Sequence, residues 1–276
     1  METHNGPFGI EFIKIPSGIC EVGTNKGGWI YASERPRYRA SLPSYSIMKT
    51  PVTLQQAAEI FDEKKPENDH LLDNIDHSII EEISRVISKN SGFEVRPPSH
   101  AEWLRAEELY GLDLPCGFTE VLSDFPHANY RGAPLDGRPR TTNESEAFEH
   151  FKSAIACHPK KNNLRIKSHV TVDRPQKEVV FRLVMVQETR EETCHYVPDG
   201  SDLRSNIIQE SIWITLLGII PSFTIPILRG FSDYAVDGWV NLLFGGLCIG
   251  FVSGAFWRPK TKTYEVDANG ELTSFR

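Results

Sequence analysis

The distribution of apolar residues along the chain changes at Glu210. Before this point apolar and polar positions are interspersed, whereas after it two stretches, residues 211–228 and 238–257, carry no charged residue. At 1.5 Å rise per residue these stretches form helices of roughly 27 and 30 Å, which match the hydrocarbon core of a bilayer, about 30 Å thick. The pattern predicts two transmembrane helices joined by a short connector.

Aromatic and basic residues give the two predicted spans an orientation. Trp213, Trp239 and Trp257 lie near the ends of the stretches, where amphipathic rings prefer the membrane interface. The connector carries one basic residue, Arg229, and the positions just outside the spans carry Arg204, Arg258, Lys260 and Lys262. The positive-inside rule therefore predicts a multi-pass membrane protein with two spans and both termini in the cytoplasm.

Small residues and prolines mark the inner faces of the predicted spans. Gly246, Gly250 and Gly254 recur every four residues and so share one helix face, where a partner backbone can approach closely. This face fits either the seam of the hairpin itself or an interface with a second copy or another membrane protein. Pro221 and Pro226 predict a kink in the first span, which suits either simple packing or a pore. Neither span contains an ionisable residue, which argues against a transporter or proton relay.

The chain before the spans has the pattern of a mixed α and β domain. Residues 12–18 and 40–53 are strand-like and end at proline or glycine. Thr53 with Gln56, and Ser99 with Glu102, form capping boxes that predict two helix starts. A further helix is predicted over residues 74–90, a long irregular segment over 129–143, and a last strand over 178–186. The predicted organisation is a cytoplasmic α+β domain over 1–187, a polar linker over 188–206, a transmembrane hairpin over 207–258 and a cytoplasmic tail over 259–276.

Charge and cysteine usage narrow the classes of function. Thirty-seven acidic against 30 basic side chains give a net charge of −7, and no long basic run is present, so nucleic acid is not an expected partner. Five widely spaced cysteines, without a C-x-x-C pair, are typical of reduced cytosolic thiols and do not indicate a zinc site. The first residues lack the basic and apolar regions of a secretion signal.

Several motifs, in order along the chain, resemble one known family. They are "FIKIPSG", "ERPRYRASLPSYSIMKTPVT", "RPPSHAEWLRAEELYG", "ANYRG" and "VFRLV". Together they are similar to the formylglycine-generating enzyme, or sulfatase-modifying factor, family across most of residues 10–186. The resemblance implies a C-type-lectin-like fold with much irregular structure. In the members that oxidise cysteine it also implies a copper site made by two cysteines four residues apart.

The chain departs from this family at the residues that carry its chemistry. Only Cys157 lies near the expected copper site, and no second thiol follows it in "HPKKNNLRIK". A lone thiolate is a poor copper(I) site, because this ion is best held by two soft ligands. Cys157 remains the one candidate catalytic residue, and its neighbour His158 would point to the opposite face of a strand. We therefore expect no metal site and no cofactor; copper or iron would be required if the protein were an enzyme.

The predicted irregular segment carries the candidate ligand-binding residues. Asp124, His127, Asn129 and Arg131 fall where lectin-like folds form their binding face. The expected function is a membrane-anchored, non-catalytic sensor that binds a protein or small-molecule ligand on its cytoplasmic domain. One version of this expectation is a membrane effector of a prokaryotic defence or signalling system. The alternatives are a metal-dependent oxidase or other modifying enzyme of the same family, and an accessory subunit of a membrane complex.

Overall fold

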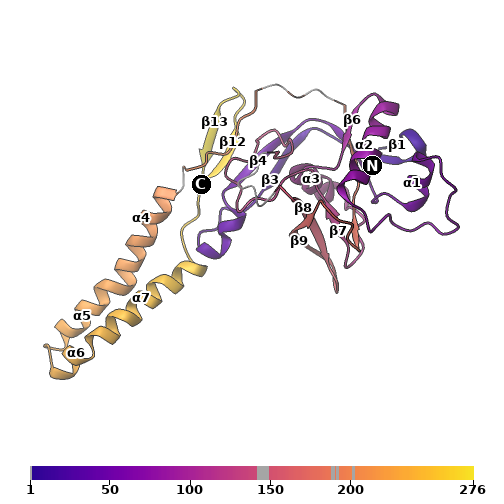
Figure 1. Cartoon of the computed structure of the whole chain (residues 1–276). Coiled ribbons are helices and arrows are strands. Elements are labelled where there is room, and N and C mark those ends of the chain that lie inside the picture. The colour runs from indigo at the N-terminus through magenta and orange to yellow at the C-terminus, as the bar shows by residue number, and fades with distance from the viewer. Residues whose placement is uncertain (1, 142–148, 188–189, 191–192, 201–202) are drawn as a thin grey trace. The chain divides into compact units, whose positions relative to one another are not determined.

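The computed structural model describes the chain except for residues 1, 142–148, 188–189, 191–192 and 201–202 (Figure 1). It divides into two compact units. The first comprises Met1–Val22, Arg39–His127 and Pro134–His195, and the second comprises Gly23–Tyr38, Ala128–Ala133 and Tyr196–Arg276. The architecture is mixed, with three sheets among the described residues. Two segments that precede the helical hairpin by many residues, 23–38 and 128–133, thus belong to the same unit as the hairpin.

The first unit is built around a five-stranded sheet. Its order is β1 (Thr3–Asn5), β2 (Glu11–Ile15), β5 (Tyr45–Met48), β11 (Val184–Val186) and β6 (Glu94–Arg96). Ile47 in β5 lies opposite Ile13 on one side and Val184 on the other, all three fully buried. The strand-like pattern at 12–18 is confirmed where it overlaps β2, and the pattern at 40–53 is confirmed where it contains β5.

The described residues of this unit form the α-helices α1 (Leu54–Ile60), α2 (His77–Ser91) and α3 (His100–Tyr110). Both predicted capping boxes are present, at Thr53 and at Ser99, so the local signals are confirmed. Helix α2 begins only after its cap, Asp76, and Ile80, Ile83 and Ile87 are its buried apolar side chains. Ile79 and Val86, each one residue before a buried isoleucine, are only partly buried beside the core.

A second sheet of the first unit has the order β10 (Val179–Val180), β7 (Thr119–Val121), β8 (Phe151–His158) and β9 (Lys161–Thr171). Strands β8 and β9 form a long antiparallel hairpin that the sequence pattern did not predict. The strand expected over 178–186 is divided into β10 and β11, which lie in different sheets. Between them the fully buried Arg182 donates hydrogen bonds to Glu120 and to the carbonyls of Met48 and Asp113. The strand is therefore interrupted at the residue whose buried guanidinium group needs these partners.

The remaining short elements of this unit are η1 (Pro7–Gly9) and β3 (Gly18–Val22), which lies beside β4 (Arg37–Leu42).

The second unit contains the helical hairpin. Its elements are α4 (Leu203–Ile214), the π-helical turn η4 (Thr215–Ile219), α5 (Ile220–Leu228), α6 (Asp233–Asp237) and α7 (Trp239–Phe256). Two helices, Arg204–Leu228 and Trp239–Phe256, are long and apolar enough to cross a membrane. They run side by side (Figure 1), and a Cβ atom on Gly246 would lie 2.6 Å from the carbonyl oxygen of Gly218. The glycine face of the second helix is therefore the seam of the hairpin at Gly246.

Pro221, the first of the two prolines in the first helix, closely follows the π-helical turn η4. Pro221 has no N–H group to donate to the carbonyl of Leu217, and the turn just before it is widened so that the Ile220 N–H bonds to the Thr215 carbonyl.

The other described elements of this unit are the 3-10 turn η2 (Trp29–Glu34) and two strands, β12 (Thr263–Val266) and β13 (Leu272–Phe275). Strand β12 pairs with β13 and, in parallel, with the first residues of β4, Arg37 and Tyr38. The segment expected to be only a tail thus holds a strand pair.

Candidate functional site

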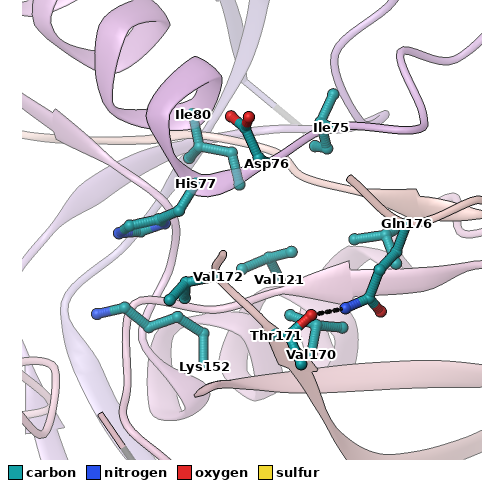
Figure 2. A pocket seen from close by; sticks show the side chains of 11 residues that line it. Ile75, Asp76, His77, Ile80, Val121, Lys152, Val170, Thr171, Val172 and Gln176 are labelled. Carbon is teal, nitrogen blue, oxygen red and sulfur yellow. Dashed lines mark hydrogen bonds between the residues drawn. The ribbon is translucent and has the colours of Figure 1, made fainter. Parts of the chain in front are cut away.

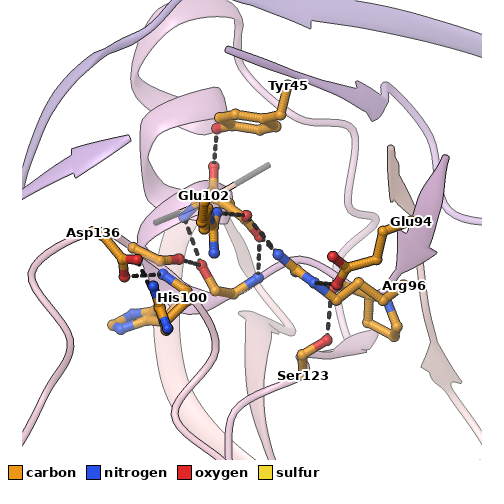
Figure 3. A network of polar contacts seen from close by, with 12 residues as sticks. Tyr45, Glu94, Arg96, His100, Glu102, Ser123 and Asp136 are labelled. Atoms are coloured by element: carbon orange, nitrogen blue, oxygen red, sulfur yellow. Dashed lines mark hydrogen bonds and ion pairs between the residues drawn. The ribbon is translucent and has the colours of Figure 1, made fainter. Parts of the chain in front are cut away.

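The buried carboxylate of Glu102 is the centre of a polar network in the first unit (Figure 3). Arg96 donates to both of its oxygens at 2.8 Å, Arg190 donates at 2.6 Å, and the Ser99 backbone N–H donates at 2.7 Å. Burial alone would raise the pKa of Glu102, but the Arg96 guanidinium outweighs it, and the pKa falls to about 2. Every oxygen of this carboxylate is occupied by the protein itself, so the network supports helix α3 and does not present a reactive group.

Two of the predicted ligand-binding residues lie in the first unit, close to this network. Asp124 accepts hydrogen bonds from the backbone N–H groups of His100, at 2.7 Å, and Arg140, at 2.8 Å. Burial raises its pKa, against the lowering effect of these two bonds. The ring Nδ1 of His127 lies 2.7 Å from the carbonyl of Phe125. Both side chains therefore hold the local backbone, and a ligand role for them stays a prediction.

The other two predicted residues lie in the second unit. The side-chain oxygen of Asn129 accepts a hydrogen bond from the Arg131 N–H at 2.9 Å, which forms a local turn. This turn belongs to the segment Ala128–Ala133, and the Arg131 side chain lines a cavity of that unit. The sequence grouped four residues by their proximity along the chain, whereas the structure distributes them between the two units.

Cys157 has a second thiol beside it that the sequence pattern did not indicate. The Gly117 N–H bonds to the Cys157 carbonyl at 3.2 Å, and the side chain of Cys116 interacts with that of Cys157. Burial raises the pKa of the Cys157 thiol, although Arg165, whose NH1 lies 3.0 Å from the sulfur, lowers it. Two thiols suit copper(I), but no group of three or more His, Cys, Asp or Glu side chains that could hold a metal occurs among the described residues. The pair therefore does not fit iron, which takes more ligands.

A small cavity of the first unit lies between the start of α2 and the sheet of β7 to β9 (Figure 2). Figure 2 shows His77 and Lys152 on one side of it and a hydrogen bond between Gln176 and Thr171 on the other. Its volume of about 10 Å³ is room for a single water molecule. It cannot hold a substrate, and we regard it as a packing defect at the N-terminal end of α2.

A much larger cavity, of about 620 Å³, lies within the second unit. We call it the hairpin-base cavity. Its walls come from Gly27, Gly28 and η2, from the turn at Arg131, from α4, and from the C-terminal end of α7. Its lining residues are Gly27, Gly28, Trp29, Ala32, Arg35, Arg131, Asn206, Ile207, Gln209, Glu210, Ser211, Ile214, Phe251, Arg258 and Pro259. This volume falls in the range of small-molecule binding sites, about 300–1,000 Å³.

Two consecutive glycines hold one wall of the hairpin-base cavity in place. A Cβ atom on Gly27 would lie 2.4 Å from the Pro259 carbonyl oxygen, and one on Gly28, where φ is +103°, would lie 2.7 Å from the Ala255 carbonyl oxygen. Only glycine permits this approach of the two backbones. The contact continues in the hydrogen bond from the Thr261 N–H to the Asn25 carbonyl at 2.8 Å, and in the stacking of Trp29 on Phe251.

Arg258 closes the end of the hairpin at this cavity. Its Nε and NH2 atoms donate to the two oxygens of Glu210 at 2.9 and 2.8 Å, and its NH2 also donates to the Gly250 carbonyl at 3.1 Å. The Arg258 side chain is 3% exposed and that of Glu210 is 35% exposed. This pair joins α4 to the end of α7, and next to it Trp213 and Trp257 meet edge to face at 4.5 Å.

The lining of the hairpin-base cavity combines positive charge with apolar surface. It contains three arginines, Arg35, Arg131 and Arg258, and one acid, Glu210, which pairs with Arg258. The apolar part includes Trp29, Ile207 and Phe251, which are 50%, 65% and 57% exposed and so extend the apolar lining to the surface. Guanidinium groups beside apolar side chains are the kind of lining that small-molecule sites have.

Of the sequence-predicted residues, only Arg131 takes part in this cavity. The glycine pair at 27–28 and the lone acid at 210, just before the uncharged stretch, were visible in the sequence. The glycine pair could have indicated a close approach of two backbones, and the acid could have indicated a basic partner at the edge of the membrane. Their partners, Pro259 and Arg258, are far away along the chain, so their pairing could not be read from local patterns.

Comparisons with known proteins show the fold of this chain and no family. No protein-family model and no curated protein matches the sequence. Among solved structures, PvdO from Pseudomonas aeruginosa is similar, with a TM-score of 0.50 and 13% identity over 67% of this chain and 97% of that one. Treponema denticola variable protein 1 is similar to the same degree, with a TM-score of 0.50 and 13% identity over 67% of this chain and 98% of that one. At this identity the likeness concerns the fold alone, and it accounts for about two thirds of the chain.

Proposed function

We propose that this protein is a two-span membrane protein that binds a ligand without catalysing a reaction, and that the hairpin-base cavity is its binding site. The observation that carries the proposal is the exposure of the hairpin. Only 17% of the most apolar window of each long helix is buried, and large side chains such as Phe244, Ile249 and Leu228 are 68%, 63% and 85% exposed. An apolar surface of this kind is stable in a bilayer and a liability in water.

The aromatic residues of the hairpin support the same proposal. Trp213 and Trp257 pack together near the base, and Phe223 and Trp239 pack at 5.4 Å near the connector. Aromatic pairs near both ends of the hairpin suit the two interfaces of a membrane. We further propose that both termini lie in the cytoplasm, as the distribution of basic residues favours, and that residues 1–187 form a degenerate formylglycine-generating-enzyme-like domain of C-type-lectin-like fold. The capping of α3 by Ser99 and the full burial of Trp103 are consistent with the motif on which this resemblance rests.

Membrane integration is tested with a pair of matched variants. Aspartate is introduced at Ile249 on the exposed face of α7, or at Ile166 on β9, which is 44% exposed. The full chain should remain in the membrane pellet after alkaline carbonate extraction. Ile249→Asp should raise the fraction released to the supernatant, because a carboxylate at mid-membrane costs about 3 kcal/mol, whereas Ile166→Asp should change nothing. Wild-type protein that is extracted by carbonate would contradict the proposal.

The widened turn at η4 favours one more specific version, a membrane effector that opens when a ligand binds. The π-helical turn before Pro221 is a point at which the first span can change its path. A leakage assay on liposomes that contain the full chain distinguishes the effector from a plain anchor. Intact liposomes at high protein density would contradict the effector version and leave the anchor.

The contact between Cys116 and Cys157 favours a second candidate, an enzyme that uses copper(I) bound by two thiols. This candidate predicts copper in protein purified after reconstitution, lost in Cys157→Ala and Cys116→Ala and retained in Cys194→Ala. When bound, the metal would supply the redox chemistry, and Cys116 and Cys157 would hold it. Absence of copper from the wild-type protein would remove this candidate.

A further inference from the structure

We infer that Cys116 and Cys157 form a redox modification site, at which exchange with a small-molecule disulfide such as oxidised glutathione joins the two side chains in an intramolecular disulfide. Both residues belong to the first unit. The inference therefore goes beyond the proposed function, because neither the helical hairpin nor the hairpin-base cavity takes part in the reaction. It also requires no metal, in contrast to the copper candidate.

The backbone brings the two cysteines together. The Cys157 N–H bonds to the Phe118 carbonyl at 2.9 Å, and the Gly117 N–H bonds to the Cys157 carbonyl at 3.2 Å. Cys116 directly precedes Gly117, and its side chain interacts with that of Cys157. Backbone segments that exchange hydrogen bonds in this way lie about 5 Å apart, within the span of about 4–7 Å that a disulfide bridges between two Cα atoms.

The two thiols differ in accessibility, and this difference gives them different roles. Cys116 is exposed, whereas Cys157 is buried and only 2% exposed. A soluble disulfide can therefore reach Cys116 first. Cys157 has to reach only the sulfur of Cys116 beside it, so its burial does not prevent a second step. The NH1 group of Arg165, 3.0 Å from the Cys157 sulfur, supplies a positive charge next to the thiolate that attacks.

The reaction consists of two exchange steps. The Cys116 thiolate attacks one sulfur of oxidised glutathione, which releases one glutathione thiolate and leaves a mixed disulfide on Cys116. The Cys157 thiolate then attacks the Cys116 sulfur and releases the second glutathione. The two protein thiols lose two electrons and two protons, and one oxidised glutathione becomes two reduced glutathione molecules. In a reducing cytosol such a bond is transient, as in proteins that sense the redox state.

The test uses the full chain in detergent with a copper(I) chelator present. The protein is incubated in glutathione buffers of increasing oxidised fraction, and the remaining thiols are alkylated in denaturant. Peptide mapping without reduction then identifies the linked cysteines. The variants are Cys116→Ser and Cys157→Ala, and the control is Cys194→Ser. Cys194 is a suitable control because it is partly exposed in the same unit, with its thiol beside Asp136 and Arg138.

The expected product in the wild-type protein is a disulfide between Cys116 and Cys157, with the loss of two hydrogen atoms from the chain. Cys194→Ser should form the same bond, and Cys116→Ser should not. Cys157→Ala should accumulate about tenfold more glutathione adduct on Cys116 than the wild type does, because the neighbouring thiol that would displace the glutathione is missing.

Two results would overturn the inference. One is a wild-type protein that stops at the glutathione adduct on Cys116, since Cys157 would then be out of reach of the Cys116 sulfur. The other is a wild-type disulfide that links Cys116 or Cys157 to a different cysteine. Neither result bears on carbonate extraction or on ligand binding in the hairpin-base cavity, so this inference and the proposed function fail separately.

Discussion

Arg258 and Glu210 are 48 residues apart in sequence, and two hydrogen bonds, of 2.8 and 2.9 Å, join them across the base of the helical hairpin. The arginine is almost completely buried and also donates to Ser253 and to two backbone carbonyls. When the acid is removed, so deeply buried an arginine cannot replace the carboxylate with water, and its charge is left without a counter-ion. The pair therefore fixes the relative position of α4 and the end of α7, which form two walls of the hairpin-base cavity.

Removal of Glu210 should destabilise the hairpin base. We expect Glu210→Gln to lower the free energy of unfolding by about 1–3 kcal/mol, less than the full cost of an unpaired buried charge because Glu210 is partly exposed. Thermal unfolding in detergent measures this effect, and a double-mutant cycle with Arg258→Met isolates the pair. The matched control is Glu82→Gln, whose partner Arg85 is on the surface; an equal loss there would contradict a special role for Arg258 and Glu210.

Two adjacent glycines of α7 should respond in opposite directions to alanine. A Cβ atom on Gly246 would lie 2.6 Å from the Gly218 carbonyl oxygen, whereas a Cβ atom on Gly245 meets nothing within 4 Å. Gly245→Ala should raise stability by up to about 1 kcal/mol through helix propensity, and Gly246→Ala should lower it because the helices must separate. The melting temperature in detergent measures both. A similar gain in the two variants would show that the glycine seam is not at Gly246.

Acid should destabilise the first unit through Glu102. The pKa of Glu102 is lowered to about 2, so its contribution is present at neutral pH and is lost as the pH falls from about 4.5 towards 2. The contribution is on the order of 3 kcal/mol. Glu102→Gln should cost about 3–5 kcal/mol at pH 7, since it leaves Arg96 and Arg190 without a charged partner. It should also flatten the pH dependence of unfolding in this range. An unchanged slope would contradict the assignment of this acid dependence to Glu102.

The cysteines should differ in their reactivity in the folded protein. Cys116 is exposed, whereas Cys20 and Cys157 are each 2% exposed, and burial raises the pKa of Cys20 to about 12. Alkylation at pH 8 should therefore modify Cys116 and spare Cys20 and Cys157, because only the accessible thiolate reacts. Unfolding in denaturant should make all three reactive. Peptide mapping after a timed alkylation measures the order, and early modification of Cys20 would contradict its burial.

Local signals in the sequence predicted the elements whose stabilising contacts are close along the chain. The capping boxes at Thr53 and Ser99 depend on side chains three residues apart, and the two long apolar helices depend only on uninterrupted composition. The hairpin of β8 and β9 was missed because its strands carry many polar side chains. The break at Arg182 was missed because the partners that stabilise it, Glu120 and the carbonyls of Met48 and Asp113, come from other parts of the chain.

The sequence by itself determined that this chain has an α+β part and two apolar helices, because periodicity, caps and composition act over a few residues. Only the tertiary structure decided which residues form a site. It placed Gly27 against Pro259, Arg258 against Glu210, and Arg131 in the wall of a cavity. Each of these contacts joins segments separated by many residues, and the energy that stabilises them comes from packing and ion pairing in three dimensions, which no local pattern records.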